Sequence, residues 1–396
     1  MEDAGNLGVA LEWSGLLSKW RSFTPIIARF HNITNLQFIF LTLPRTFPVA
    51  LTSLPMLSDL TLEQCTFRGP ATFYGLQLKI LRLRIKDICW DNEPDEISLL
   101  RSCPLLRVLY LGWHYRIADT LNIENTRDVS QHLYDLTVNS VPRGWSSDQT
   151  KRLQEQRTFF TFIEAWRGLK SLTLVGSWPF FEAGAFPAVQ QAFPDYLDTY
   201  NGPIHFFRSA IPPHIGLKKA VFLERHLSLP ELQVFLPSLP VVTRVALTGI
   251  CLKKDTNMGE DALRLVFKQC KLLEEFMIVP AHVPLHGAAW ILDMVRRSLH
   301  HLQNIRLIYI PRIDAYDLDV EQAFDGLHDI CPSLREVQFH DRKWVFGNGI
   351  ASLRSQLYPL QCLDQQRRTN NINESNLRKA SLYTVLYKSH QEIVVT

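Results

Sequence analysis

The nine residues LSDLTLEQC at positions 57–65 place three leucines, Leu57, Leu60 and Leu62, at a spacing of three and then two. Leu60 and Leu62 alternate with polar residues, which is the period of a β-strand that buries one face. The same apolar spacing returns ten more times along the chain. These other copies begin at Ile33, Leu78, Leu106, Leu133, Leu169, Leu217, Val242, Leu273, Leu302 and Leu334. All but one of the steps between successive copies measure 21–36 residues, so the chain is built from internal repeats.

Between these strand patterns the apolar period becomes helical. Segment 261–276 places Leu263, Val266 and Cys270 at helical spacing before the next strand, and segments 97–103, 159–169, 288–302 and 322–331 do the same. A strand and a helix that repeat every twenty to thirty residues are typical of a leucine-rich repeat. We therefore predict an α/β leucine-rich-repeat solenoid of the ribonuclease-inhibitor-like kind, with parallel strands on the concave face and helices on the convex face.

The repeats divide the chain into three parts. We predict an N-terminal cap segment at 1–32, the solenoid at 33–345, and a C-terminal cap with a partly mobile polar tail at 346–396. The spacing fails most clearly between Leu169 and Leu217, where segment 177–213 carries six prolines and nine aromatic residues. This segment is either an insertion that projects toward a partner, or a degenerate repeat that fills the core, because a step of 48 is twice 24.

Composition limits the environment and the partner. A net charge of +3 on 396 residues gives no reason to expect nucleic acid or an anionic membrane as a partner. The N-terminus has no basic segment before an apolar run, as a secretory signal would, and the most apolar stretch, at 35–44, is too short to span a bilayer.

The seven cysteines of the sequence do not form a disulfide framework. Cys103, Cys270 and Cys331 each precede a repeat by three residues, which predicts buried thiols in a reducing, cytoplasmic or nuclear compartment.

No catalytic pattern is present in the sequence. We find no phosphate-binding glycine–lysine loop, no dinucleotide-binding glycine fingerprint and no nucleophile elbow. His282 and His286 are four residues apart, but Pro284 between them breaks the helix that would align them. His300 and His301 point in different directions on a helix, with no further ligand at metal-binding spacing. We therefore predict a protein that is not an enzyme and that uses no cofactor and no metal.

The concave face is the predicted contact surface. Residues flanking the second leucine of each strand point away from the core, and five of them are acidic and five basic. This balance suits recognition of a protein, where mixed charge sets specificity. Inner positions of the later repeats include Lys219, Glu275, Met277, Glu336 and Gln338. Aromatic residues just beyond strand ends either contact a partner or pack the loops of one rim. The candidate contact residues are Arg82, Arg84, Tyr110, Trp113, Tyr115, Trp178, Phe180, Phe181, Arg244 and Arg306.

Three stretches also carry a family resemblance: LPMLSDLTLEQC at 54–65, SCPLLRVLYLGW at 102–113 and ICPSLREVQFHDRKW at 330–344. Together they resemble the repeat region of fungal F-box leucine-rich-repeat proteins, above all the divergent set of mushroom-forming fungi, over residues 30–345. The resemblance implies a substrate-recognition scaffold that an N-terminal F-box joins to the adaptor of a cullin-type ubiquitin ligase. No F-box pattern is evident before the first repeat. The alternative is a monomeric, free-standing repeat scaffold, sensor fragment or inhibitor unrelated to ubiquitin.

Overall fold

One curved sheet runs from Val9 to Gln356. The computed structural model describes residues 9–12, 32–39, 41–63, 65–67, 73–84, 99–113, 132–140, 146–164, 166–176, 178, 197–210, 216–223, 228–239, 241–250, 258–280, 288–299, 304–310, 324, 327–339, 342–347 and 350–356. The sheet has 15 strands in the order β1-β2-β4-β6-β7-β8-β9-β10-β11-β12-β13-β14-β15-β16-β17. Every pairing from β1 to β15 is parallel, and this is the architecture that a stacked strand–helix repeat produces.

The strands of the sheet follow the predicted repeats closely. Their bounds are β1 Val9–Glu12, β2 Asn35–Ile39, β4 Asp59–Glu63, β6 Ile80–Arg84, β7 Val108–Trp113, β8 Asp135–Ser140, β9 Ser171–Gly176, β10 Thr199–Gly202, β11 Lys219–Phe222, β12 Arg244–Ile250, β13 Glu275–Pro280, β14 Leu307–Ile310, β15 Glu336–Phe339, β16 Arg342–Gly347 and β17 Ile350–Gln356. Two short strands, β3 Thr42–Leu43 and β5 Thr66–Phe67, form a separate parallel pair. The leucines stay level across neighbouring strands: Leu60 pairs with Leu81, and Leu81 with Leu109.

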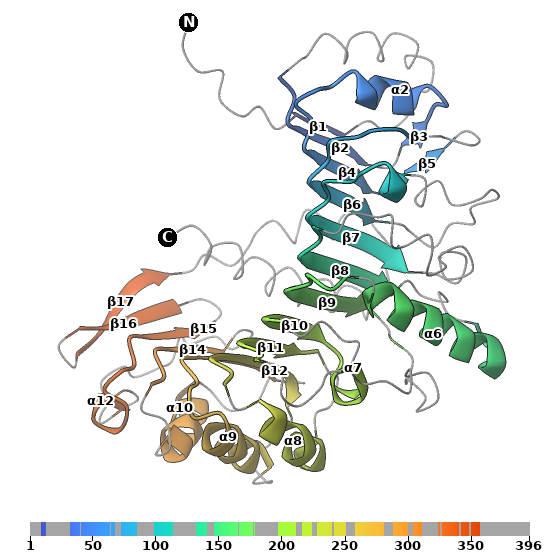
Figure 1. The fold of residues 1–396 in the computed structure, drawn as a ribbon. Helices are drawn as coiled ribbons and strands as arrows, with labels where there is room; N and C mark the ends of the chain where they lie inside the picture. The colour runs from blue at the N-terminus through green and yellow to red at the C-terminus, as the bar shows by residue number, and fades with distance from the viewer. Residues whose placement is uncertain are drawn as a thin grey trace, which may run out of the picture.

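Helices lie on the outer side of the curve, so the strands line the concave face and the predicted solenoid is confirmed (Figure 1). The helices are α2 Phe47–Thr52, α6 Gln149–Glu164, α7 Ile204–Ala210, α8 Leu229–Phe235, α9 Met258–Gln269, α10 Ala288–Ser298 and α12 Leu327–Ile330, and a 3-10 helix spans Leu236–Ser238. Helix α8 begins with a reciprocal cap, in which Ser228 accepts a bond from the Glu231 amide and the Glu231 carboxylate accepts one from the Ser228 amide. This cap satisfies two amides that the first turn of a helix leaves unpaired.

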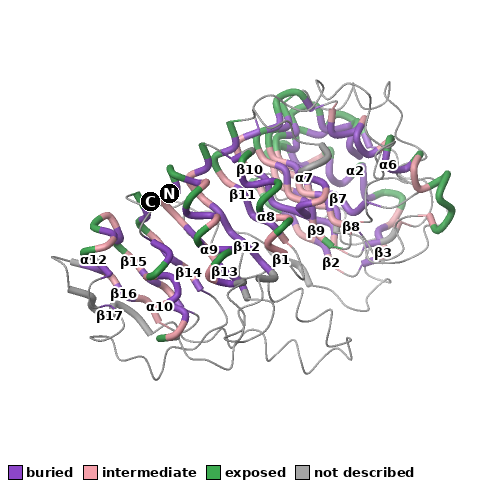
Figure 2. The backbone as a smooth tube through the Cα atoms, turned by 90° about the horizontal axis from the view of Figure 1, so that it is seen from below, coloured by how far each residue is buried: buried purple, intermediate pink, exposed green. Residues whose placement is uncertain are grey.

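The strands and helices enclose one continuous hydrophobic core, which follows the solenoid along its length (Figure 2). The predicted thiols belong to it, since Cys103, Cys270 and Cys331 are fully buried. Together with buried Cys65 they are free of disulfides. Burial raises the pKa of Cys103 and of Cys270 to about 12, because a thiolate cannot be hydrated there. These three thiols are therefore core residues, as predicted.

The proline-rich segment 177–213 contains a further repeat. Strand β10 lies between β9 and β11, and Leu197 and Tyr200 are buried. Tyr200 is level with Leu172 on β9 and with Ala220 on β11, which occupy the same apolar position of their repeats. Leu197 follows Leu169 by 28 residues and precedes Leu217 by 20, so the long step is two ordinary ones. Gly202 stands at the third apolar position, which hides the repeat from a search for leucines. The second of the two interpretations is therefore correct for the described part, 197–210.

One predicted repeat has the wrong register. The copy placed at Leu302 would bury Ile305 and Leu307, but the structure buries Ile305, Ile308 and Ile310 and leaves Leu307 half-buried. Two overlapping apolar spacings compete in this stretch, and they differ by three residues. Because side chains alternate between the faces of a strand, an odd shift exchanges the core face for the concave face. This exchange moves Ile308 into the core and brings Tyr309 to the concave face.

Both ends of the sheet extend beyond the predicted solenoid limits. At the N-terminal end, β1 pairs in parallel with β2, so residues 9–12 of the predicted cap segment are part of the sheet. At the C-terminal end the direction reverses, since β16 is antiparallel to both β15 and β17 and crosses the predicted boundary at 345. Trp344 of β16 is fully buried against Phe324 and Phe339. A hairpin therefore closes the C-terminal end of the sheet.

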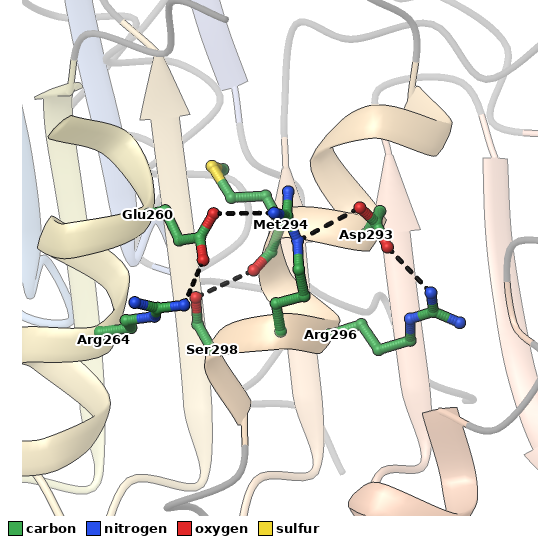
Figure 3. Close-up of polar contacts among 7 residues, drawn as sticks. Glu260, Arg264, Asp293, Met294, Arg296 and Ser298 are labelled. Carbon is green, nitrogen blue, oxygen red and sulfur yellow. Dashed lines mark hydrogen bonds and ion pairs between the residues drawn. The ribbon is translucent and has the colours of Figure 1, made fainter. Parts of the chain in front are cut away.

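On the convex side, a chain of alternating charges connects α9 to α10 (Figure 3). The Glu260 carboxylate lies 2.5 Å from Arg264 on its own helix and 3.2 Å from Arg297 on the next. Arg297 lies 3.2 Å from Asp293, whose second oxygen is 2.9 Å from Arg296. Exposed ion pairs of this kind contribute about 0–1 kcal/mol each. The contact between Glu260 and Arg297 links the helices of two neighbouring repeats.

Candidate binding surface

The concave face of the C-terminal strands carries two rows of side chains that are set by strand register. The first row is Lys219, Arg244, Glu275, Leu307 and Glu336, on β11 to β15. The second row, two residues further along each strand, is Val221, Ala246, Met277, Tyr309, Gln338 and, through the antiparallel pairing, Lys343 of β16. These two rows line a hollow of about 250 Å³, which we call the concave hollow.

Two ion pairs stand in the concave hollow. Arg244 is paired with Glu275 on the neighbouring strand. Lys343 Nζ lies 2.7 Å from a carboxylate oxygen of Glu336. All four side chains are partly exposed, at 24–34 %. Since strand β14 lies between Glu275 and Glu336, the first pair lies toward β11 and the second toward the C-terminal hairpin.

Lys219 adds a third positive charge beside the first ion pair. The pKa of Lys219 is lowered to about 8, first by burial and second by the Arg244 guanidinium, while the Glu275 carboxylate opposes both. Burial also raises the pKa of Glu275, against the influence of Arg244 and Lys219. The two shifts share one cause, which is the poor hydration of charged groups at this point. The β11–β12 end of the hollow therefore brings Lys219, Arg244 and Glu275 together in a poorly hydrated place.

The floor of the hollow at this end is apolar. Val221 and Ala246 are 3 % and 5 % exposed and pack with Leu223 and Met277 in a cluster separate from the main core. At the same level of the sheet, other strands carry polar residues such as Thr137 and Thr173. An apolar patch beside charged side chains is a pattern of binding sites, because the patch contributes contact area while the polar groups orient the ligand.

Two of the predicted arginines lie on the concave face. Arg244 belongs to the hollow. Arg82 lies on β6, where its Nη1 is 2.6 and 2.8 Å from the two carboxylate oxygens of Asp59 on β4. That contact neutralises the charge of Arg82 within the chain. Arg84 lies in the same strand, and its side chain is outside the described part of the structure. Tyr110, beside Arg82 on β7, is half-buried.

The aromatic residues at the strand ends pack the rim, and Trp113 is wrong as a contact residue. Its ring is 0 % exposed and lies edge-on to Phe159 of α6, with 4.8 Å between the centroids. Trp178 is half-buried against the same Phe159, and its indole N–H donates to the carbonyl oxygen of Val175 at 2.8 Å. The long helix α6 covers this rim, which explains the burial of both rings. Tyr115, Phe180 and Phe181 lie outside the described residues.

Arg306 is also misplaced, as a consequence of the register error. It precedes β14, where its amide donates to the carbonyl oxygen of Glu274 at 2.7 Å, and its side chain is 65 % exposed. Its guanidinium lies 3.8 Å from the Glu274 carboxylate, at the start of the strands and not in either concave row. Strand alternation identified Lys219, Glu275 and Glu336 as concave residues but could not show that they gather in a hollow. Lys343 and Tyr309 were not identified.

Comparison with known proteins gives structural similarity alone. No family model matches the sequence, and no curated protein matches it. Among solved structures, the crystal structure of the Rad7 and Elc1 complex in yeast aligns over 86 % of this chain and 86 % of that chain, with 10 % identity and a TM-score of 0.39. A similarity at this level carries no argument about function. The fold assignment rests on the repeats and on the sheet itself.

Within the described residues, no helix is long and apolar enough to cross a membrane. Nor do three or more histidine, cysteine, aspartate or glutamate side chains gather there at a place suited to a metal ion.

Proposed function

We propose that this protein is a non-catalytic scaffold that holds a protein partner against its concave face, with the concave hollow as the centre of contact. One observation carries the proposal: an apolar floor, Val221 and Ala246, lies on the concave side of the sheet between charged residues. The groups around that floor are two ion pairs and Lys219, which suit recognition of a complementary surface.

The finer proposal is that the partner is a substrate of a cullin-type ubiquitin ligase, for which this chain is the recognition part. It is supported by the resemblance of the repeat segments to those of F-box proteins. The competing proposal is a free-standing scaffold unrelated to ubiquitin. The free, buried cysteines are compatible with a reducing cytoplasmic or nuclear location for either one.

Site-specific cross-linking tests the proposal. A photo-reactive phenylalanine analogue at Met277, within the hollow, should cross-link to a partner in cell extract. The same analogue at Thr137, at the same level of the sheet on β8, is the matched control. Cross-links at Thr137 or on the convex helices, with none at Met277, would show that the hollow is not the centre of contact. A ligase adaptor in the purified complex would favour the ubiquitin-linked role, and its consistent absence would favour the free-standing scaffold.

A further inference from the structure

The concave hollow has room for one large side chain of a partner. Its volume is about 250 Å³, whereas an apolar cavity of roughly 150 Å³ already holds a benzene molecule. Pockets for drug-sized ligands are larger, at about 300–1,000 Å³. The hollow is therefore of the size that holds one aromatic side chain together with part of its backbone.

The groups around the apolar floor favour an aromatic ring over an aliphatic side chain. Met277 and Tyr309 are level with each other on β13 and β14, and Arg244 lies two residues before Ala246 on β12. A thioether makes favourable contacts with the edge of a ring, a second ring packs against a tyrosine ring, and a guanidinium lies over the face of a ring. A ring between Ala246 and Met277 is bordered by Arg244 and Tyr309, because neighbouring strands are about 4.8 Å apart.

Two polar side chains of the hollow can hold the backbone of the segment that carries the ring. Tyr309 and Gln338 are level with each other on β14 and β15, and both are half-buried. Within the described part of the chain, neither side chain makes a hydrogen bond. The Gln338 amide offers a donor and an acceptor, as a peptide group does, and the Tyr309 hydroxyl offers a donor. A peptide group of a partner matches both.

The charged side chains of the hollow are already matched within the chain. Arg244 is paired with Glu275, which also attracts Lys219, and Lys343 is paired with Glu336. A charged occupant would have to compete with one of these contacts, and a charge that loses its partner in poorly hydrated surroundings is destabilised. The hollow therefore favours an uncharged ring over an acidic or a basic side chain.

We propose that the concave hollow binds an uncharged aromatic side chain of a protein partner, phenylalanine or tryptophan, which rests on Val221, Ala246 and Met277. Tyr309 packs against the ring, and its hydroxyl and the Gln338 amide bind the adjoining peptide group. The inference rests on the proposed function and specifies the chemistry of the partner. A buried aromatic anchor of this kind supplies much of the binding energy in many protein interfaces.

A displayed library of random twelve-residue peptides, flanked by linkers on both sides, is a direct probe of the full chain. Selected peptides should be enriched in phenylalanine or tryptophan. The best of them, synthesised with both ends blocked, should bind about three- to tenfold more weakly when its aromatic residue is replaced by leucine, because the ring contacts are lost while an apolar side chain remains. Leucine at a position that the selection leaves variable is the matched control and should not change the affinity.

Nuclear magnetic resonance of the methionine methyl groups reports where the ring binds. A ring on the floor of the hollow should shift the Met277 methyl signal through its ring current, and Met277→Leu identifies that signal by its loss. Met56, which precedes β4 and is 56 % exposed, and Met294, which is buried in α10, are internal controls and should not move. The leucine form of the peptide should leave the Met277 signal close to its unbound position.

Two variants of the chain test the site from the other side. Ala246→Phe fills the floor with a ring of the chain itself and should abolish peptide binding. Thr137→Phe is the matched control, because Thr137 lies in the same row of the sheet on β8, outside the hollow. Tyr309→Phe keeps the ring and removes only the hydroxyl, so it should weaken binding about two- to tenfold. That variant changes a single atom, so it keeps the test valid even if Ala246→Phe does not fold.

The outcomes separate this inference from the proposed function. If Ala246→Phe blocks the selected peptides but these show no preference for aromatic residues, the inference is wrong and the scaffold proposal stands. The same conclusion follows if an aromatic peptide shifts the Met277 signal no more than its leucine form does. If Ala246→Phe leaves all peptide binding intact and no peptide shifts the Met277 signal, or if no peptide is recovered, both proposals are contradicted.

Discussion

Gly202 and Tyr200 allow a direct test of the repeat hidden in the proline-rich segment. A Cβ added at Gly202 would lie 2.7 Å from Tyr200 Oη, 3.0 Å from Tyr200 Cζ and 3.0 Å from Leu174 Cβ. Tyr200 is held in place, because its hydroxyl donates to the carbonyl oxygen of Pro203 at 2.7 Å and its ring stacks on Phe206. Gly202→Ala must therefore push against a fixed side chain.

The magnitudes follow from these contacts. Forcing a methyl group into a packed core costs about 1–3 kcal/mol, which is the expected loss of unfolding free energy for Gly202→Ala. Tyr200→Phe removes the donor to a buried carbonyl and should cost about 1–2 kcal/mol. In the double variant the hydroxyl that meets the new methyl is gone. We therefore expect the double variant to lose roughly 1 kcal/mol less unfolding free energy than the two single variants lose together.

Urea unfolding followed by circular dichroism measures all three variants. Gly216→Ala is the control, since no atom lies within 4 Å of its added Cβ and the residue is exposed, so it should change stability by less than about 0.5 kcal/mol. Wild-type stability of Gly202→Ala, or strict additivity in the double variant, would refute the packing described for β10. It would also restore the interpretation of this segment as a projecting insertion.

Three further predictions address the core, the thiols and the hollow. Leu60→Asp should reduce the unfolding free energy by about 3–5 kcal/mol, because Leu60 is fully buried, whereas Lys79→Asp at an exposed site should change it little; urea unfolding tests both. Cys103 and Cys270 should react with iodoacetamide only after unfolding, and rapid labelling in the native protein, detected by mass spectrometry, would contradict their burial. Lys219 keeps its proton up to about pH 8 in the folded chain and up to pH 10.5 in the unfolded chain. Protonated Lys219 therefore lowers the free energy of unfolding by its full amount below pH 8, and this loss disappears as the pH rises from 8 to 10.5. Lys219→Met should therefore be more stable than wild type at pH 7, with the difference shrinking across that window, and a constant difference would show that the pKa of Lys219 is not lowered.

The strand pattern identifies most of the solenoid because burial on one face of a strand is a local property of the sequence. Leu60, Leu62 and their counterparts alternate with polar residues, and this alternation also assigns Lys219, Arg244 and Glu275 correctly to the concave face. The sequence pattern does not give the register between neighbouring strands. Whether three charged residues on three strands form a site depends on register, and register depends on packing.

The errors have the same physical origin. At β14, two apolar spacings coexist in one stretch, and packing against β13 and β15 selects the one that buries Ile308 and Ile310. Lys343 reaches the hollow only because β16 turns back on β15, which a search for parallel repeats does not anticipate. Trp113 looks like a surface anchor in the sequence, because the helix that covers it, α6, begins 36 residues later.

The C-terminal reversal has a consequence for the order of folding. Residues that pair between parallel neighbours in this sheet are twenty or more positions apart in the sequence, so each pairing must close a long loop before it gains any contact energy. Strands β16 and β17 are separated by two residues, and a hairpin of that kind forms in about 1–10 μs. Once formed, it offers β15 a ready partner strand at low entropic cost. We therefore expect amide protection in a refolding experiment to appear early in this hairpin and in β15, and later at β8 and β9.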